Sequence, residues 1–170
     1  MRELADRVAA IRLVVFDVDG VFTDGRLFYT ADGEEIKVFH VRDGVGVKAL
    51  RHAGIELAVI SGRSSDAVAL RMAELGIKRI FQGDHDKLPL LHRLLSEIGV
   101  TAAETAFVGD DEPDIPVLRQ VGLAACPADA HPSVKEVCQW IGRQEGGRGA
   151  VREFCDFFLS HRPATAENPS

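Results

Sequence analysis

Two aspartates stand one residue apart at the end of the apolar segment Val14-Val15-Phe16-Asp17-Val18-Asp19-Gly20. This run is typical of a buried parallel strand, which would deliver both carboxylates to the carboxyl edge of an open α/β sheet, where such folds bind ligands. Because neighbouring carboxylates repel each other, keeping both ionised calls for a cation, and hard oxygen ligands suit Mg²⁺. Asp17 would then be a nucleophile toward phosphorus and Asp19 an acid and base beside it. Taken alone, the pair could equally be a strand end with two solvated acids.

Polar side chains also follow the later apolar runs. They are Ser61 in Val59-Ile60-Ser61-Gly62-Arg63, Lys87 after Asp86, and Asp110, Asp111 and Asp114 after Phe107-Val108-Gly109. Phosphoryl transfer needs a nucleophile, a cation and donors for the equatorial oxygens, and all these residue types are present. Individually, Ser61 could be an ordinary residue at a helix N-terminus and Lys87 a solvated lysine. Their common place at strand ends favours a shared active site.

The bulk composition is that of an ordinary globular protein. The chain has 170 residues, 46% of them hydrophobic, and a net charge of -6. We expect one domain over residues 1–162, and the acidic balance argues against a nucleic-acid partner. Residues 1–10 lack the apolar core of a secretion signal, and no stretch has the ~18 apolar residues of a membrane span. We therefore expect a cytoplasmic protein with no membrane partner, whose cysteines (Cys126, Cys138 and Cys155) are reduced thiols.

The elements that must position these residues alternate along the chain. Apolar runs predict strands at residues 12–16, 56–60, 79–82, 105–108 and 123–126. Helical periodicity predicts helices at residues 45–53, 65–75, 87–98 and 115–121, each followed by glycine, with further periodic segments at 133–141 and 151–159. Strands that alternate with helices in this way indicate an α/β fold with a doubly wound, Rossmann-like parallel sheet.

One segment interrupts this alternation. Residues 26–30 and 35–41 alternate apolar and polar side chains around Ala31-Asp32-Gly33-Glu34, which has the composition of a hairpin turn. We expect a short β-hairpin flap over residues 26–41, above the carboxylate edge, and no large cap domain. The last residues, 163–170, are polar and contain proline, and we expect them to be a disordered tail.

These motifs and their order resemble the haloacid dehalogenase superfamily of phosphotransferases over nearly the whole chain. The matching motifs are Asp17-Val18-Asp19-Gly20, Ser61 in Ile60-Ser61-Gly62-Arg63, Lys87, and Gly109-Asp110-Asp111-Glu112-Pro113-Asp114. The resemblance implies that Asp17 attacks phosphorus to form an aspartyl-phosphate. It implies that Asp19 protonates the leaving alcohol and then activates water, while Ser61 and Lys87 hold the phosphoryl oxygens.

The same resemblance implies that Mg²⁺ is the cofactor. The ion would be bound by the Asp17 side chain, the Asp19 main-chain carbonyl and Asp110, with Asp111 or Asp114 in support. Members of the superfamily usually carry a large cap domain that selects the substrate, whereas only a short hairpin interrupts this chain. An uncapped site needs another way to exclude water, and assembly of several subunits can provide it.

Further segments resemble the 3-deoxy-D-manno-octulosonate 8-phosphate phosphatase family, namely residues 20–25, 33–39, 42–44, 61–65, 82–87 and 146–153. The resemblance implies a homotetramer in which the hairpins meet in a central barrel. It implies that the flexible C-terminal segment, residues 146–162, reaches a neighbouring active site, so we expect that removing the residues after Glu145 leaves the core folded. It also implies substrate contacts from Thr23, Asp24, Arg63 and Arg148. A sugar acid phosphate needs cations beyond those on its phosphate, and arginine suits carboxylates.

The favoured function is a Mg²⁺-dependent phosphatase that hydrolyses 3-deoxy-D-manno-octulosonate 8-phosphate through an aspartyl-phosphate, a step toward lipopolysaccharide. Arg63 favours this eight-carbon substrate as a correlation within the family, and a nine-carbon sugar acid phosphate is the alternative. A phospho-receiver domain also has early acids, a hydroxyl residue and a lysine, but it needs its phosphate-accepting Asp at the end of a later strand. A non-catalytic oligomeric module is disfavoured because every catalytic position is filled.

Overall fold

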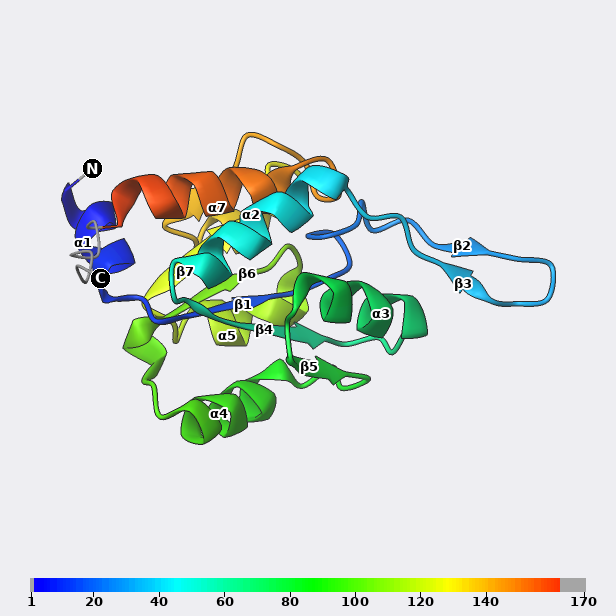
Figure 1. Cartoon of the computed structure of the whole chain (residues 1–170), viewed down its shortest axis with the longest axis horizontal. Coiled ribbons are helices and arrows are strands. Elements are labelled where there is room, and N and C mark those ends of the chain that lie inside the picture. The colour runs from blue at the N-terminus through cyan, green and yellow to red at the C-terminus, as the bar shows by residue number, and fades with distance from the viewer. Residues whose placement is uncertain (1, 163–170) are drawn as a thin grey trace, which may run out of the picture.

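A parallel sheet forms the centre of the protein in the computed structural model, which describes residues 2–162 (Figure 1). The strand order is β5-β4-β1-β6-β7-β8, and each neighbouring pair is parallel. The bounds are β1 Leu13–Phe16, β4 Glu56–Ser61, β5 Arg79–Gln82, β6 Thr105–Val108, β7 Leu123–Cys126 and β8 Trp140–Ile141. The predicted doubly wound sheet is confirmed, because the chain moves outward from β1 in both directions. The predicted tail at 163–170 lies outside the described residues.

Helices cover both faces of this sheet. They are α1 Arg2–Ala10, α2 Val41–His52, α3 Asp66–Leu75, α4 Lys87–Ile98, α5 Ile115–Leu118, α6 Pro132–Lys135 and α7 Ala150–His161, with 3-10 turns η1 Ala102–Glu104 and η2 Glu112–Asp114. In β1, Val14 and Phe16 pack in the core cluster that includes α2, α3 and α7. Leu13 and Val15 pack in the cluster that includes α4, α5 and α6. This explains the uninterrupted apolar run, because a strand covered on both faces has no solvent face. Within residues 2–162, no helix is long and apolar enough to cross a membrane.

The prediction of a helix over residues 133–141 is wrong. Helix α6 ends at Lys135, and the chain then extends into β8 at the edge of the sheet. The backbone N–H of Gln139 donates to the carbonyl of Ala124 at 2.9 Å, and the rings of Trp140 and Phe157 stack with centroids 5.4 Å apart. Pairing with the open edge of β7 and this aromatic contact therefore outweigh the helical periodicity. Two smaller differences are that the helix predicted at 115–121 ends at Leu118 and that α1 was not predicted.

The predicted hairpin lies between β1 and α2. Its strands, β2 (Phe28–Tyr29) and β3 (Glu35–Ile36), pair antiparallel. The ribbon projects beyond the end of the sheet, on the right of Figure 1. The turn closes as the N–H of Gly33 donates to the carbonyl of Thr30 at 3.0 Å. Apolar side chains on this projection are exposed, with Tyr29 at 56% and Val38 at 61% of their full exposure.

The C-terminal helix α7 belongs to the core of its own chain. It packs against α2 (Figure 1), and Phe154 and Phe158 are completely buried. The carboxylate of Asp43, in the first turn of α2, accepts a hydrogen bond from the N–H of Arg152 at 2.9 Å. The expectation that residues after Glu145 can be removed without unfolding the core is therefore wrong. Burial of one such phenylalanine typically contributes about 1.5–3 kcal/mol.

Candidate active site

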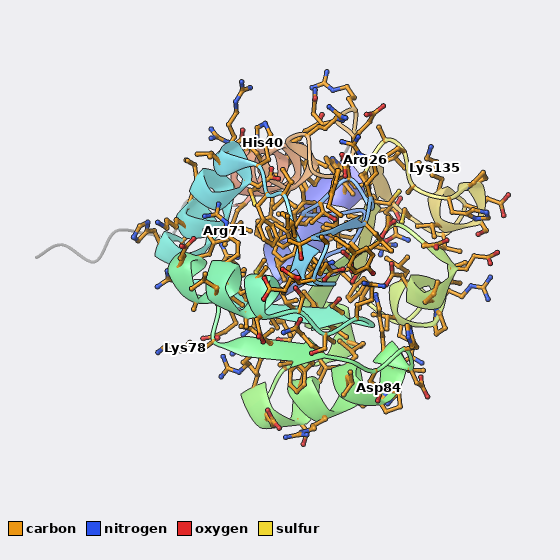
Figure 2. The ribbon with its side chains drawn as sticks, turned by 90° about the vertical axis from the view of Figure 1, so that its right-hand side faces the viewer. Arg26, His40, Arg71, Lys78, Asp84 and Lys135 are labelled. Carbon is orange, nitrogen blue, oxygen red and sulfur yellow. The ribbon has the colours of Figure 1, made fainter. Side chains whose placement is uncertain are left out.

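The ends of β1, β4 and β6 bring the predicted residues to one edge of the sheet. Phe16 lies opposite Val59 of β4 and Val108 of β6 in the parallel register, so the residues that follow these strands leave the sheet together. Figure 2 shows the molecule from the hairpin end. An open cavity of about 260 Å³ lies here, with Arg63 and His85 in its wall. The predicted catalytic and metal residues all line it: Asp17, Asp19, Ser61, Lys87, Asp110, Asp111 and Asp114.

A larger cavity, of about 780 Å³, lies beside α7. Trp140 and Phe157 contribute to its wall, together with the arginines Arg42, Arg143, Arg148 and Arg152. We place the candidate active site in the smaller cavity because that cavity holds a buried carboxylate, a buried lysine and a group of carboxylate oxygens that could hold a metal ion. Chemistry, rather than volume, decides between the two.

Asp17 and Lys87 form a buried ion pair at the centre of the site. The Nζ atom of Lys87 lies 2.9 Å from Oδ1 of Asp17 and 2.6 Å from Oδ1 of Asp114. Burial opposes the charged form of Lys87, but the two carboxylates outweigh it and raise the pKa of the lysine. Burial and the Asp114 carboxylate raise the pKa of Asp17 to about 7, although Lys87 acts in the opposite direction. One lysine therefore does not neutralise the carboxylates gathered here.

Asp110 lies beside the carboxylates of Asp17 and Asp114. Its Oδ1 atom is buried, and within the described residues it has no hydrogen-bond partner. Burial, followed by the carboxylates of Asp17 and Asp114, raises the pKa of Asp110 to about 9. One oxygen from each of these three aspartates lies within 4.8 Å of the others. A divalent cation among them would offset their repulsion and give Asp110 Oδ1 a partner, so this donor set fits a hard ion such as Mg²⁺.

Asp114 accepts hydrogen bonds from Lys87 on one side and from the loop of Asp110 on the other. While its Oδ1 accepts from Lys87, its Oδ2 accepts from the backbone N–H groups of Asp110 at 2.9 Å and of Asp111 at 3.3 Å. A Cβ atom on Gly109 would lie only 2.6 Å from Cγ of Asp114, so glycine is needed for this close return. The side chain of Asp111 instead accepts from the N–H of Glu112 at 2.8 Å and caps η2. Of the two predicted supporting residues, Asp114 is the one grouped with Asp17 and Asp110.

Asp19 faces the hairpin and takes part in a set of charges that sequence reasoning did not identify. Its Oδ1 accepts from Nζ of Lys37, and its Oδ2 lies 3.8 Å from Nε of Arg63. Glu35 lies 2.6 Å from Nη2 of Arg63 and 3.5 Å from Nζ of Lys37. The hydroxyl of Tyr29 also accepts from Arg63, at 3.1 Å. The period-two pattern was the available signal, because alternation puts Glu35 and Lys37 on one face of the hairpin.

Ser61 ends β4 and is buried, with 2% of its surface exposed. The loop after it approaches His85, since a Cβ atom on Gly62 would lie 2.7 Å from Nδ1 of that histidine. His85 also lines the cavity, and its position just before Asp86-Lys87 was the only sequence signal for it. Ser61, Lys87 and His85 therefore form the wall on the β4 and β5 side.

The remaining predicted substrate residues lie on the loop after β1 and on the segment before α7. The hydroxyl of Thr23 is turned into its own loop, where it accepts from the N–H groups of Gly20 at 3.4 Å and Gly25 at 3.3 Å. Asp24 pairs with Arg26 at 2.6 Å and lies 3.8 Å from Arg148. This pairing with Arg26 lowers the pKa of Asp24. Neither Thr23 nor Asp24 lines the cavity, whereas Arg63 does.

The segment that carries Arg148 is held against the same loop. The N–H of Gly147 donates to the carbonyl of Val21 at 3.0 Å. A Cβ atom on Gly146 would lie 1.8 Å from the carbonyl oxygen of Gly20, so no other residue type could approach so closely. Arg148 itself has 58% of its side chain exposed. Residues 146–149 are therefore packed on their own chain, with the guanidinium of Arg148 beside the loop rather than in the cavity.

Known proteins are similar to this chain in both sequence and fold. The family model for haloacid dehalogenase-like hydrolases matches residues 40–122. The 3-deoxy-D-manno-octulosonate 8-phosphate phosphatase KdsC of Yersinia pestis is 43% identical over 157 residues, which cover 92% of this chain and 84% of that protein.

Two solved structures extend the comparison. A 3-deoxy-D-manno-octulosonate 8-phosphate phosphatase from Moraxella catarrhalis, in complex with a magnesium ion, a phosphate ion and a KDO molecule, has a TM-score of 0.93 and 40% identity, covering 95% of this chain and 93% of that one. The cobalt-bound form of the corresponding Haemophilus influenzae phosphatase has a TM-score of 0.88 and 44% identity, covering 92% and 91%. Identity of 40% or more over most of each chain shows that this chain belongs to the 3-deoxy-D-manno-octulosonate 8-phosphate phosphatase family of haloacid dehalogenase-like hydrolases.

Proposed function

We propose that the protein is a Mg²⁺-dependent phosphatase that hydrolyses 3-deoxy-D-manno-octulosonate 8-phosphate to 3-deoxy-D-manno-octulosonate and phosphate. The observation that carries the proposal is the buried Asp17 at the end of β1, held 2.9 Å from Lys87 and grouped with Asp110 and Asp114. The identity of the substrate is inferred from the relatives, one of which was solved in complex with magnesium, phosphate and KDO. Because these relatives carry the eight-carbon name, we prefer this substrate to a nine-carbon sugar acid phosphate.

In the first step, an oxygen of Asp17 forms a bond to phosphorus while the bond from phosphorus to the sugar oxygen breaks. Asp19 gives a proton to the departing sugar oxygen, so the sugar leaves as the neutral alcohol. Asp19 then takes a proton from water, and the water oxygen attacks phosphorus and releases phosphate from Asp17. Ser61 and Lys87, both buried at the cavity wall, are placed to bind the equatorial oxygens of the phosphoryl group.

Asp17, Asp110 and the main-chain carbonyl of Asp19 would hold the metal, and Asp114 would support it. When bound, Mg²⁺ supplies positive charge that offsets the phosphoryl group and the surrounding carboxylates. Asp114 would act mainly by orienting, because both of its oxygens already accept hydrogen bonds, from Lys87 on one side and from the Asp110 loop on the other.

Selection of the sugar acid is assigned to Arg63 and Arg148, with Thr23 and Asp24 shaping the loop between them. Arg63 reaches the cavity, and its Nε atom is buried without a hydrogen-bond partner among the described residues. A substrate carboxylate would supply that partner, because guanidinium and carboxylate groups match in geometry. In the single chain, Arg148 lines the larger cavity beside α7 and not the active-site cavity. Its contact with substrate would therefore involve a neighbouring subunit.

The exposed hairpin supports assembly into a homotetramer. Its apolar side chains, Leu27, Phe28, Tyr29, Ile36 and Val38, are each at least 39% exposed in the single chain. Several exposed large apolar side chains on one short hairpin are typical of a protein interface. We propose that hairpins from several copies pack together, and that the exposed Arg148, on the C-terminal segment just before α7, contacts a neighbouring site while the rest of that segment stays packed on its own chain. The three free cysteines support a reducing, cytoplasmic location.

Phosphate release from a panel of sugar acid phosphates tests this function directly. With Mg²⁺ present, the eight-carbon ester is expected to be hydrolysed faster than the nine-carbon ester, and the variant Asp17→Asn is expected to be inactive. Asp32→Asn is the matched control, because it makes the same change at an exposed turn residue. Preference for the nine-carbon ester would correct the substrate and leave the mechanism standing. Full activity of Asp17→Asn would refute the mechanism.

A further inference from the structure

Four charged residues form a closed ring between the hairpin and the active site. In order around the ring they are Asp19, Lys37, Glu35 and Arg63, so negative and positive charges alternate. Lys37 contacts Asp19; the other three neighbouring pairs lie 3.5, 2.6 and 3.8 Å apart. Two members come from the hairpin and two from the loops after β1 and β4.

Lys37 is the member of this ring that joins the hairpin to Asp19. Only 4% of its side chain is exposed, although it lies next to Ile36 and Val38, which are 49% and 61% exposed. A lysine side chain loses rotamer entropy when it is fixed in this way, so its contacts must offset that loss. Its Nζ atom spans from Glu35 on its own strand to Oδ1 of Asp19 in the cavity. Within the described residues, it is the one hairpin cation that contacts a carboxylate lining the cavity.

The contact fixes how the Asp19 carboxylate is presented. Asp19 lies at the mouth of the cavity, with 23% of its side chain exposed, so its carboxylate is free to rotate unless something holds it. Lys37 binds Oδ1, so the other oxygen, Oδ2, lies on the side of Arg63, at 3.8 Å from its Nε atom, in a residue that lines the cavity. An acid and base works only from within hydrogen-bonding distance of the atom that gains or loses the proton.

From this geometry we infer that Lys37 is a positioning residue for Asp19, and that the hairpin thereby sets the protonation of the leaving group. The inference rests on the proposed phosphatase function and adds to it a second task for the hairpin. Lys37 does not line the cavity, and in the proposed mechanism the phosphoryl group is bound by Asp17, Ser61 and Lys87. Replacing Lys37 should therefore slow hydrolysis of esters whose leaving oxygen needs a proton. Hydrolysis of esters whose leaving group departs as a stable anion should change little.

Two aryl esters separate this role from recognition of the sugar. Phenyl phosphate has a basic leaving oxygen, p-nitrophenyl phosphate has a weakly basic one, and neither carries a sugar. The measured quantity is kcat/KM with Mg²⁺, because it reports only the steps up to release of the phenol. In Lys37→Met, this value for phenyl phosphate should fall about 10–100-fold more than for p-nitrophenyl phosphate, which is less than the roughly 10²–10⁴-fold of a complete loss of general acid catalysis because Asp19 itself remains. Asp19→Asn should change the ratio in the same direction and by more.

Three further variants complete the test. Lys37→Arg keeps the cation, so its ratio of kcat/KM for phenyl phosphate to kcat/KM for p-nitrophenyl phosphate should stay close to that of the wild type. Lys78→Met is the matched control, because Lys78 (labelled in Figure 2) is exposed just before β5. It therefore lies at the amino end of that strand, whereas the site lies at the carboxyl ends of the strands. This variant should leave both esters unchanged. Thermal unfolding of Lys37→Met should match that of the wild type within a few degrees, since the hairpin lies outside the core. If Lys37→Met does not fold, Lys37→Gln replaces it.

The outcomes are distinct. An equal fall for both aryl esters would mean that Lys37 only supports the structure. A fall confined to the sugar phosphate would mean direct contact with the sugar. Either result would overturn the inference and leave the phosphatase function intact. Absence of phosphate release from every ester by the wild type would instead refute the proposed function itself.

Discussion

Replacing Gly20 with alanine should separate activity from stability. Gly20 has φ +84°, and a Cβ atom built on it would lie 1.9 Å from Oδ2 of Asp110. That oxygen would have to retreat by about 1.5 Å to reach the 3.4 Å of ordinary van der Waals contact. The displaced atom is the end of a side chain, so the fold can yield there easily. The same movement takes Asp110 out of the group that would hold Mg²⁺.

The magnitude follows from these two effects. A left-handed backbone is disfavoured for alanine by about 1–2 kcal/mol, which lowers the Tm of a chain of this size by about 2–8 °C. Misplacement of a catalytic group by about 1 Å can lower turnover by about 10²-fold. We therefore expect Gly20→Ala to lose about two orders of magnitude in kcat and to require more Mg²⁺ for half-maximal activity. Its loss of thermal stability should remain modest.

Gly33 provides the matched control. It has the same φ of +84°, but a Cβ atom there would have no neighbour within 4 Å. Gly33→Ala should therefore show a similar change in Tm and normal phosphate release. Calorimetry and phosphate release over a Mg²⁺ series measure both quantities. The reasoning is refuted if Gly20→Ala turns over at the wild-type rate with an unchanged Mg²⁺ dependence.

Three other perturbations have defined outcomes. Phe154→Ala should lower the free energy of unfolding in urea by about 3–5 kcal/mol, because the side chain is completely buried between α7 and the sheet; a change below 1 kcal/mol would contradict this packing. Asp114→Asn should lower kcat far more than it lowers Tm, because it removes the negative charge that braces Lys87 at 2.6 Å; phosphate release and thermal unfolding measure the two, and wild-type turnover would argue against this role. Val38→Asp, on the exposed face of the hairpin, should reduce the assembled fraction in sedimentation velocity; an unchanged distribution would exclude the hairpin as the interface.

The catalytic edge could be predicted from the sequence because one rule locates it. Parallel strands end at a common edge, so apolar runs that stop at Asp17, Ser61 and Asp110 had to bring those residues together. Lys87 was assigned with them from its order in the chain and from the family resemblance. Both kinds of inference depend on local patterns that the fold leaves intact.

The features that were missed depend on contacts between distant segments. Trp140 pairs with β7 and stacks on Phe157, and neither partner can be identified from helical periodicity over residues 133–141. The ion pair of Lys37 with Asp19 joins the hairpin to the loop after β1, and nothing in the local sequence fixes the distance between them. The buried face of α7 shows the same limit, because its amphipathic pattern does not tell whether its own core or a neighbour covers it.

The packing of Gly146 and Gly147 on the loop after β1 has a consequence for synthesis of the protein. Every catalytic side chain, from Asp17 to Asp114, leaves the ribosome before Gly146 does. At about 5–20 residues per second, the loop beside Asp17 is made roughly 6–25 s before the segment that packs on it. Helix α7, which anchors that segment, is made later still. A nascent chain can thus contain all the proposed catalytic residues and still be inactive, so activity should begin only after α7 has been made.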